Sequence, residues 1–172
     1  TQKEMKVLFV IDSLSSGGAQ NQMVNLCRGL AAKGIKVDLI TYFDFDFFEH
    51  RLKNLENVNR IKLKKKSRLG VDLILQLRKL IRKGNYDIAL SYLDTPNFYL
   101  SLSNIFSFSK CKVIISYRNS TVFNISGRLM IKVLSHLFAD QVIYNSFHER
   151  DAWSQALPFL KKKMLTIYNG ID

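Results

Sequence analysis

Short apolar runs alternate along the whole chain with segments in which apolar residues recur every three or four positions. The runs are continuous rather than alternating in polarity, which is typical of parallel strands covered by helices on both faces. On this pattern we predict strands at Lys6–Ile11, Lys36–Thr41, Val58–Leu63, Asp87–Ser91, Lys112–Ser116, Gln141–Tyr144 and Met164–Tyr168.

Between the strands, the apolar residues have the period of an α-helix. One helix ends at Gly34, a second covers Val71–Lys83, and a third includes Met130–Phe138. The third helix has an apolar stripe that we expect to face the core, formed by Met130, Val133, Leu134, Leu137 and Phe138. We expect its polar residues elsewhere on the helix: Arg128, Lys132 and His136. This alternation predicts one α/β domain over residues 1–172, a Rossmann-like, doubly wound, mainly parallel sheet with helices on both faces.

Small and polar residues follow the predicted strands, at the edge where doubly wound sheets bind ligands. After the first strand, Gly17-Gly18-Ala19-Gln20 leads into a helix. Glycines allow close backbone approach to a ligand, and the N–H groups of a helix N-terminus attract phosphate. The alternative is that the two glycines form an ordinary turn between strand and helix and bind no ligand. Gly17, Gly18 and Gln20 are the candidate phosphate-binding residues.

Further candidates follow the fifth and sixth strands. Arg118 can make a bidentate contact with an anion, and Asn119 can bond sugar hydroxyls. A local salt bridge and a turn would explain the same pair. Asn145 and Ser146 precede a helix in which Ser146 and Glu149 have the spacing of a capping box, so capping alone would also account for them.

Other signals exclude several classes of site. The dinucleotide fingerprint Gly-x-Gly-x-x-Gly is missing, which argues against a short-chain oxidoreductase, and no Lys-Ser/Thr follows the glycines as in a P-loop. Asp44-Phe45-Asp46 has no supporting ligands and the histidines have no ligand spacing, so we expect no metal. Cys27 and Cys111 lie in apolar segments, and we expect them to be reduced packing residues.

The net charge of +12 indicates an anionic partner: nucleic acid, an acidic membrane surface or a phosphorylated substrate. A basic surface that only maintains solubility is the alternative. The densest basic stretch is Arg60–Arg68, and Tyr42–Phe48 is rich in aromatic and acidic residues. We expect both at a projecting loop or sheet edge. The chain has neither an apolar run of about 20 residues nor a secretory leader at its start, so we expect a cytoplasmic location, with peripheral contact at the inner face of the plasma membrane.

Taken in order, these segments resemble the N-terminal domain of family 4 (group 1) retaining glycosyltransferases of the GT-B fold. The matching segments are Lys6–Ile11, Gly17–Gln20, Leu30–Val37, Ser116–Asn119, Val142–Ser146 and Ile167–Asp172. The resemblance implies an enzyme that transfers a sugar from a nucleotide-sugar donor to an acceptor with retention of configuration, without a metal or other cofactor. It places the glycine loop near the donor diphosphate. Arg118 and Asn119 stand where many members have His and Asp, so it identifies neither the sugar nor a catalytic residue.

In that family a second Rossmann-like domain holds the nucleotide, with an Arg/Lys pair and a Glu-x7-Glu segment that this sequence lacks. We therefore expect residues 1–172 to be the acceptor-side domain, inactive alone and working with its own C-terminal nucleotide-sugar-binding domain. The expected acceptor is a bacterial lipopolysaccharide, capsule or other envelope polysaccharide, or a lipid-linked glycan, and no specific nucleic acid is expected to bind. The alternative is a non-catalytic, basic Rossmann-like module that binds nucleotides or nucleic acid.

Overall fold

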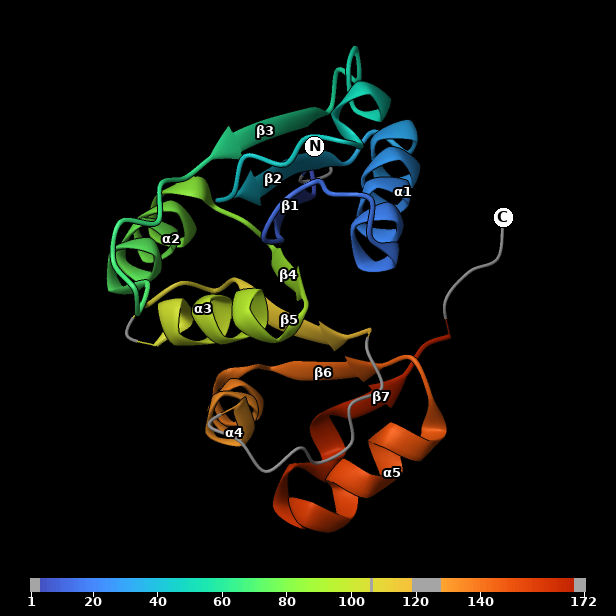
Figure 1. The fold of residues 1–172 in the computed structure, drawn as a ribbon, viewed down its shortest axis with the longest axis vertical. Helices are drawn as coiled ribbons and strands as arrows, with labels where there is room; N and C mark the ends of the chain where they lie inside the picture. Colours follow the sequence, from blue (N-terminus) through green and yellow to red (C-terminus); the bar gives the residue numbers. More distant parts are fainter. Residues whose placement is uncertain (1–3, 106, 119–127, 169–172) are drawn as a thin grey trace.

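The computed structural model of this chain describes residues 4–105, 107–118 and 128–168. A parallel sheet of order β3-β2-β1-β4-β5-β6-β7 runs through its centre (Figure 1). The strands are β1 (Lys6–Val10), β2 (Lys36–Thr41), β3 (Val58–Lys62), β4 (Ile88–Tyr92), β5 (Lys112–Tyr117), β6 (Gln141–Tyr144) and β7 (Met164–Thr166). Every predicted strand is confirmed to within two residues at each end. The strand order reverses between β1 and β4, and this switch point is where such sheets bind ligands.

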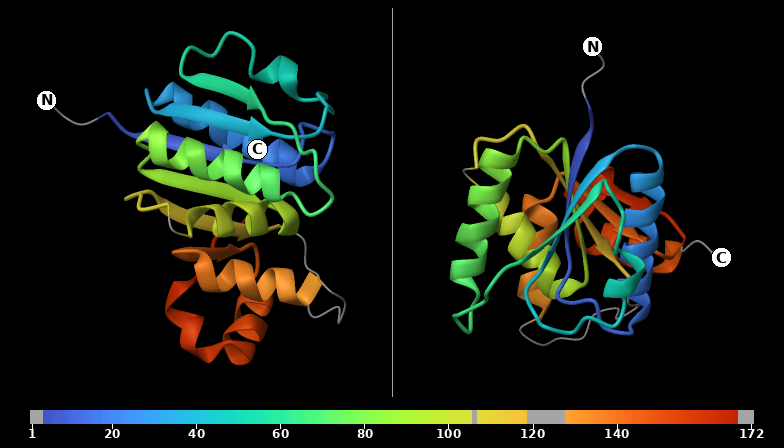
Figure 2. Two further views of the ribbon diagram at one scale, coloured as in Figure 1. Left: turned by 90° about the vertical axis from the view of Figure 1, so that its left-hand side faces the viewer. Right: turned by 90° about the horizontal axis from the view of Figure 1, so that it is seen from above.

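Helices cover both faces of the sheet, as predicted, but unevenly. They are α1 (Gly18–Ala32), α2 (Val71–Gly84), α3 (Asp94–Asn104), α4 (Arg128–Phe138) and α5 (Phe147–Ala156), with short 3-10 helices η1 (Glu49–Arg51) and η2 (Pro158–Lys163). Figure 2 shows α1 on one face and α2, α3 and α4 side by side on the other. Trp153 of α5 joins the same core as α2 and α3. The sequence pattern did not predict α3, because its Pro, Thr and Asn residues favour turns.

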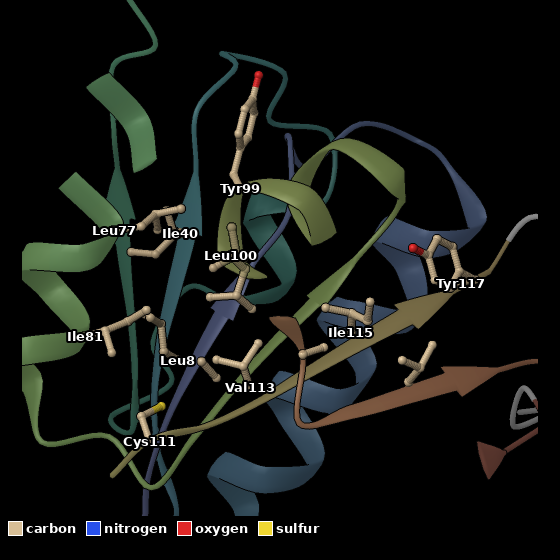
Figure 3. Close-up of a cluster of buried hydrophobic side chains, with 14 of the residues drawn as sticks. Leu8, Ile40, Leu77, Ile81, Tyr99, Leu100, Cys111, Val113, Ile115 and Tyr117 are labelled. Carbon is tan, nitrogen blue, oxygen red and sulfur yellow. The ribbon is translucent and has the colours of Figure 1, made fainter. Parts of the chain in front are cut away.

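Two hydrophobic cores form because alternate side chains of each buried strand point to opposite faces. Leu8 and Ile40 meet Leu77 and Ile81 of α2 in the larger core (Figure 3). The neighbours of Leu8 in β1, Val7 and Phe9, point to the smaller core beneath α1. Both sides of a strand are therefore apolar, which explains the continuous apolar runs in the sequence.

Helix α4 buries a different face from the one its apolar stripe predicts. Met130, Leu137 and Phe138 are 67%, 37% and 40% exposed, whereas Lys132 and His136 are 6% and 0% exposed. The predicted stripe was therefore wrong for these residues. A buried polar side chain is tolerated when it has partners, and the aromatic side chains around α4 provide them.

His136 has partners on both sides of its ring. Its Nδ1 lies 2.7 Å from the Lys132 carbonyl oxygen and its Nε2 contacts the Tyr144 hydroxyl. The ring also stacks on that of Trp153, with centroids 4.5 Å apart. Burial lowers the pKa of His136 to about 4, so the imidazole is neutral at neutral pH.

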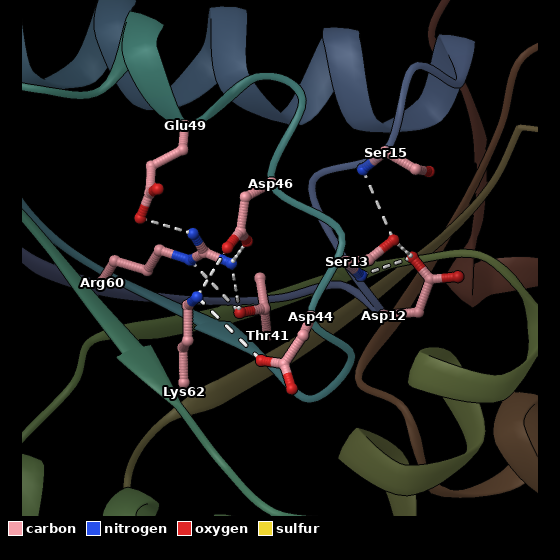
Figure 4. Close-up of polar contacts among 9 residues, drawn as sticks. All are labelled: Asp12, Ser13, Ser15, Thr41, Asp44, Asp46, Glu49, Arg60 and Lys62. Carbon is pink, nitrogen blue, oxygen red and sulfur yellow. Dashed lines mark hydrogen bonds and ion pairs between the residues drawn. The ribbon is translucent and has the colours of Figure 1, made fainter.

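The aromatic, acid-rich segment and the basic segment contact each other at the β3 edge (Figure 4). Arg60 pairs with Asp46, and also with Glu49 at 2.8 Å. Lys62 pairs with Asp46 at 2.7 Å and lies 4.0 Å from Asp44. These cations hold the pKa of Asp46 below its usual value. The first two cations of the Arg60–Arg68 stretch are thus neutralised within the fold.

Candidate functional site

The loop after β1 is held in place by the Asp12 carboxylate. Asp12 Oδ1 accepts hydrogen bonds from the Ser13 backbone N–H at 2.6 Å and from Gln20 Nε2 at 3.0 Å (Ser13 is shown with Asp12 in Figure 4). Gln20 is 7% exposed. Its side chain therefore points to Asp12 and orders the loop that the sequence predicts to bind phosphate.

Gly17 and Gly18 begin α1 at the switch point. Gly17 is the N-cap residue, and the first turn itself contains no acidic side chain. The first N–H groups carry the positive end of the helix dipole. A Cβ on Gly17 would lie 2.2 Å from Gln20 Oε1, whereas a Cβ on Gly18 would meet no atom within 4 Å. Gly17 thus permits the Gln20–Asp12 contact, and the exposed Gly18 backbone is open to a ligand. This geometry suits an anion such as a diphosphate.

Arg118 follows β5 and is fixed by the neighbouring strand. Its Nη2 donates to the Tyr92 hydroxyl at 3.0 Å, and its guanidinium lies 4.5 Å from the centre of the Tyr92 ring. Tyr92 ends β4 and is 3% exposed; burial raises its pKa and Arg118 opposes that effect. The structure thus places a cation at the edge beside the switch point.

Asn145 lies next to Arg118, but Ser146 has a structural role. Asn145 Nδ2 donates to the Arg118 carbonyl oxygen at 3.2 Å, and Asn145 Oδ1 is buried without a hydrogen-bond partner in the described part of the chain. The Ser146 hydroxyl accepts the Glu149 N–H at 3.3 Å and caps α5. Asn119, the remaining candidate, lies outside the described residues.

The Asp-x-Asp segment and the histidines show no metal site. Asp44 and Asp46 contact Lys62 as described above, and His136 is enclosed in the core. Over residues 4–105, 107–118 and 128–168, no three His, Cys, Asp or Glu residues are arranged to hold a metal ion. Cys27 and Cys111 are free thiols buried in the two cores, as the sequence predicts, and burial raises the pKa of each to about 12.

The sequence profile of Glycosyltransferase Family 4 matches residues 16–172 of this chain. The chain belongs to glycosyltransferase family 4. It is 31% identical over 98 residues to the Campylobacter jejuni GalNAc-alpha-(1->4)-GalNAc-alpha-(1->3)-diNAcBac-PP-undecaprenol alpha-1,4-N-acetyl-D-galactosaminyltransferase. That alignment covers 54% of this chain and 27% of the relative.

Solved structures share the fold of this family 4 chain. Anabaena HepE in complex with UDP superposes with a TM-score of 0.76 at 20% identity, covering 98% of this chain and 45% of HepE. A glycosyltransferase from Rickettsia africae gives a TM-score of 0.74 at 17% identity, covering 99% of this chain and 44% of that structure. The chain therefore has the Rossmann-like domain of a GT-B glycosyltransferase and spans less than half of these relatives.

The structure also brings together three charged residues that the sequence did not single out as a group: Asp94, Lys132 and Glu149. The sequence pattern places Lys132 away from the core side of its helix, and it accounts for Glu149 as part of a capping box. The Ser146–Glu149 spacing was the one signal that marked Glu149, and it pointed to the backbone rather than to a buried carboxyl.

No helix among the described residues is long and apolar enough to cross a bilayer.

Proposed function

We propose that the gene product containing this chain transfers a sugar, with retention of configuration, from a nucleotide-sugar donor to an envelope polysaccharide or a lipid-linked glycan. The observation that carries this proposal is the open N-terminus of α1, with Gly17 and Gly18, at the same edge as Arg118. In this proposal Gly17 and Gly18 hold the donor diphosphate, with Gln20 ordering their loop. Arg118, Asn119 and Asn145 contact the sugar or the acceptor, and Ser146 holds α5 beneath them.

The chemistry requires positive charge where the leaving diphosphate gains negative charge. Cleaving the bond between the sugar and the phosphate leaves an additional negative charge on the diphosphate oxygens. Preorganised N–H groups and a fixed guanidinium stabilise such charge without rearrangement. The α1 terminus and Arg118 supply both groups, so we propose a reaction that needs no metal ion.

The relatives support the substrate classes. The Campylobacter enzyme is named for an undecaprenol-diphosphate-linked glycan, and HepE was solved with UDP. Because this chain covers about 45% of HepE, we propose that a second, C-terminal domain holds the nucleotide. Residues 1–172 then form the acceptor side and one wall of the cleft, and are inactive alone.

A basic and apolar surface on α2 and the loop before it, here the α2 patch, supports contact with an anionic membrane. It consists of the exposed apolar residues Leu69, Val71 and Leu75 and the exposed cations Lys64, Lys66, Arg68, Lys79, Arg82 and Lys83. The Asp72 carboxylate accepts the Lys66 N–H at 2.7 Å and the Ser67 N–H at 3.1 Å, which fixes the basic loop on the helix. We propose that this surface faces the inner leaflet, where it brings the cleft to a lipid-linked acceptor.

The test is acceptor-dependent release of nucleoside diphosphate from a panel of nucleotide sugars, with and without EDTA. We expect turnover by the complete gene product, insensitive to EDTA, and none by residues 1–172 alone. Gly17→Ala displaces the Gln20–Asp12 contact and should lower kcat/KM for the donor by up to about 100-fold, the lower end of the cost of losing one oxyanion donor.

Gly29→Ala is the matched control, because Gly29 is exposed on the same helix and a Cβ there meets no atom within 4 Å. Equal activity of Gly17→Ala and Gly29→Ala would show that the glycine loop takes no part in the reaction. Salt-sensitive binding of nucleic acid in the absence of any sugar transfer would favour the non-catalytic alternative.

A further inference from the structure

A second group of charged residues lies below the same edge, on three different helices. Lys132 of α4 is 6% exposed, and its Nζ is 3.7 Å from Asp94 Oδ2 of α3 and 5.4 Å from the centre of the Tyr117 ring. Glu149 of α5 is 0% exposed. All three side chains act on Tyr117, the last residue of β5, which directly precedes Arg118 in the chain.

The Glu149 carboxyl group is buried and has no hydrogen-bond partner among the described residues. This holds for both of its oxygens, Oε1 and Oε2. Its backbone N–H bonds the Ser146 hydroxyl, but the side chain does not return to cap the helix. Burial raises the pKa of Glu149 to about 7, Lys132 opposes this rise and Asp94 adds to it. Unpartnered buried groups with perturbed pKa values are uncommon and concentrate at functional sites.

Asp94 connects this group to the open edge. It is the first residue of α3, its side chain is 31% exposed, and it follows Leu93, which has a positive φ of 76°. Its 3.7 Å contact with Lys132 exceeds hydrogen-bond length, and no described residue donates a hydrogen bond to its carboxylate. The Asp94 oxygens, which can only accept when ionised, are thus available to hydroxyl groups of a ligand.

We propose that Asp94 binds a hydroxyl group of the sugar acceptor, and that Lys132 and Glu149 are positioning residues that hold Asp94 in place. This inference rests on the proposed sugar transfer and adds a site to it. While Glu149 is protonated, it carries no charge that draws Lys132 away from Asp94. Once Glu149 ionises, it competes for Lys132 and loosens Asp94.

The other groups around Glu149 do not take over the role of Lys132. Tyr117 of β5 and Tyr144 of β6 lie within its electrostatic reach, and burial raises the pKa of both hydroxyls above the usual value. His136 of α4 bonds Tyr144 and is neutral. Lys132 is therefore the cation that the two carboxyl groups share.

The first test compares Asp94→Asn with Asp151→Asn in the gene product. Asp151 is an exposed carboxylate of α5 that pairs with Arg150, and it serves as the matched control. Losing a charged acceptor of a hydroxyl should lower kcat/KM for the acceptor by about tenfold or more, with the donor KM changed by less than about twofold. An unchanged kcat/KM for the acceptor in Asp94→Asn would overturn the assignment.

The second test follows the acceptor kcat/KM against pH. We expect the wild type to lose activity above about pH 7, and Glu149→Gln to lack this step while Asp151→Asn keeps it. Equal profiles for the wild type and Glu149→Gln would exclude a positioning role for Glu149.

An NMR titration of the Glu149 carboxyl in this chain separates the two proposals. Because Lys132 lowers and Asp94 raises its pKa, Lys132→Met should raise that pKa and Asp94→Asn should lower it. If both pKa shifts occur but the gene product has no transferase activity, the charged group is supported and the proposed function is rejected. A Glu149 pKa that neither variant moves would reject the group itself.

Discussion

Helices α2 and α4 lie on the same face of the sheet, on either side of α3, and both have sharply amphipathic sequences. Helix α2 buries Leu73, Leu77 and Ile81 and presents charge to the solvent, as its pattern predicts. Helix α4 buries Lys132 and His136 and exposes Met130. Helix α4 thus buries a face that combines polar residues with Leu129 and Val133, whereas the buried residues of α2 are apolar.

The difference comes from what each helix packs against. Beneath α2, β1 and β2 present Leu8 and Ile40, which offer no hydrogen bonds. Beneath α4, β5 and β6 present the hydroxyl-bearing rings of Tyr117 and Tyr144, which can satisfy polar side chains. Helical periodicity indicates that a helix has two faces, and the partner surface decides which face is buried.

The largest expected effect is on the free energy of unfolding. It compares Leu77 of α2 with Met130 of α4, two apolar residues that the sequence pattern predicts to be buried. Leu77→Ala should cost about 2–5 kcal/mol of unfolding free energy, because it opens a cavity in a fully buried site. Met130→Ala should cost about 0.5 kcal/mol or less, since Met130 is 67% exposed. Urea denaturation would measure both, and equal losses would mean that α4 buries its apolar stripe after all.

A second prediction concerns pH, because the two buried titratable groups act in opposite directions. Glu149 keeps its proton in the folded state from its usual pKa of 4.5 up to about 7, so its contribution to stability falls as pH rises through that window. His136 stays neutral in the folded state down to about pH 4, so its contribution falls as pH drops below 6.5. The pKa shift of each group contributes up to roughly 3 kcal/mol to the free energy of unfolding, at about 1.4 kcal/mol per pKa unit.

Because these contributions partly cancel, wild-type stability should vary little between about pH 4.5 and 6.5. Glu149→Gln removes one of them, and its unfolding free energy should rise with pH across this window by up to roughly 3 kcal/mol. Denaturant titrations at several pH values would show the slope, with Asp151→Asn as the variant expected to match the wild type. A flat Glu149→Gln profile would mean that His136 does not titrate as its burial requires.

The smallest expected effect is on membrane binding by exposed lysines of α2 and α1. Lys79→Ala in the α2 patch should weaken binding to anionic vesicles by about 1 kcal/mol, roughly fivefold, at low salt. Lys33→Ala, an exposed cation at the end of α1 on the other face of the sheet, should leave binding unchanged. Vesicle sedimentation would measure both. Binding that neither anionic lipid nor salt affects would reject membrane contact through the α2 patch.

Much of the candidate site could be predicted because strand ends are visible in sequence. Arg118 and Asn145 come directly after their strands, and the glycine pair lies in the loop after β1. A parallel sheet brings those strand ends to one edge. The side-chain contacts of Gln20 with Asp12 and of Arg118 with Tyr92 were not predictable. They join residues that are apart in sequence, and their geometry depends on how the loops and strands pack.

The sequence by itself determined the β-α alternation, the strands and the edge on which the polar residues collect, because these follow from local periodicity and from where each strand ends. The tertiary structure alone decided that α3 forms, that α4 turns its polar face inward, and that Asp94, Lys132 and Glu149 meet. The physical reason is that burial of a polar or charged group depends on partners from other elements. Such partners have no fixed spacing in the sequence.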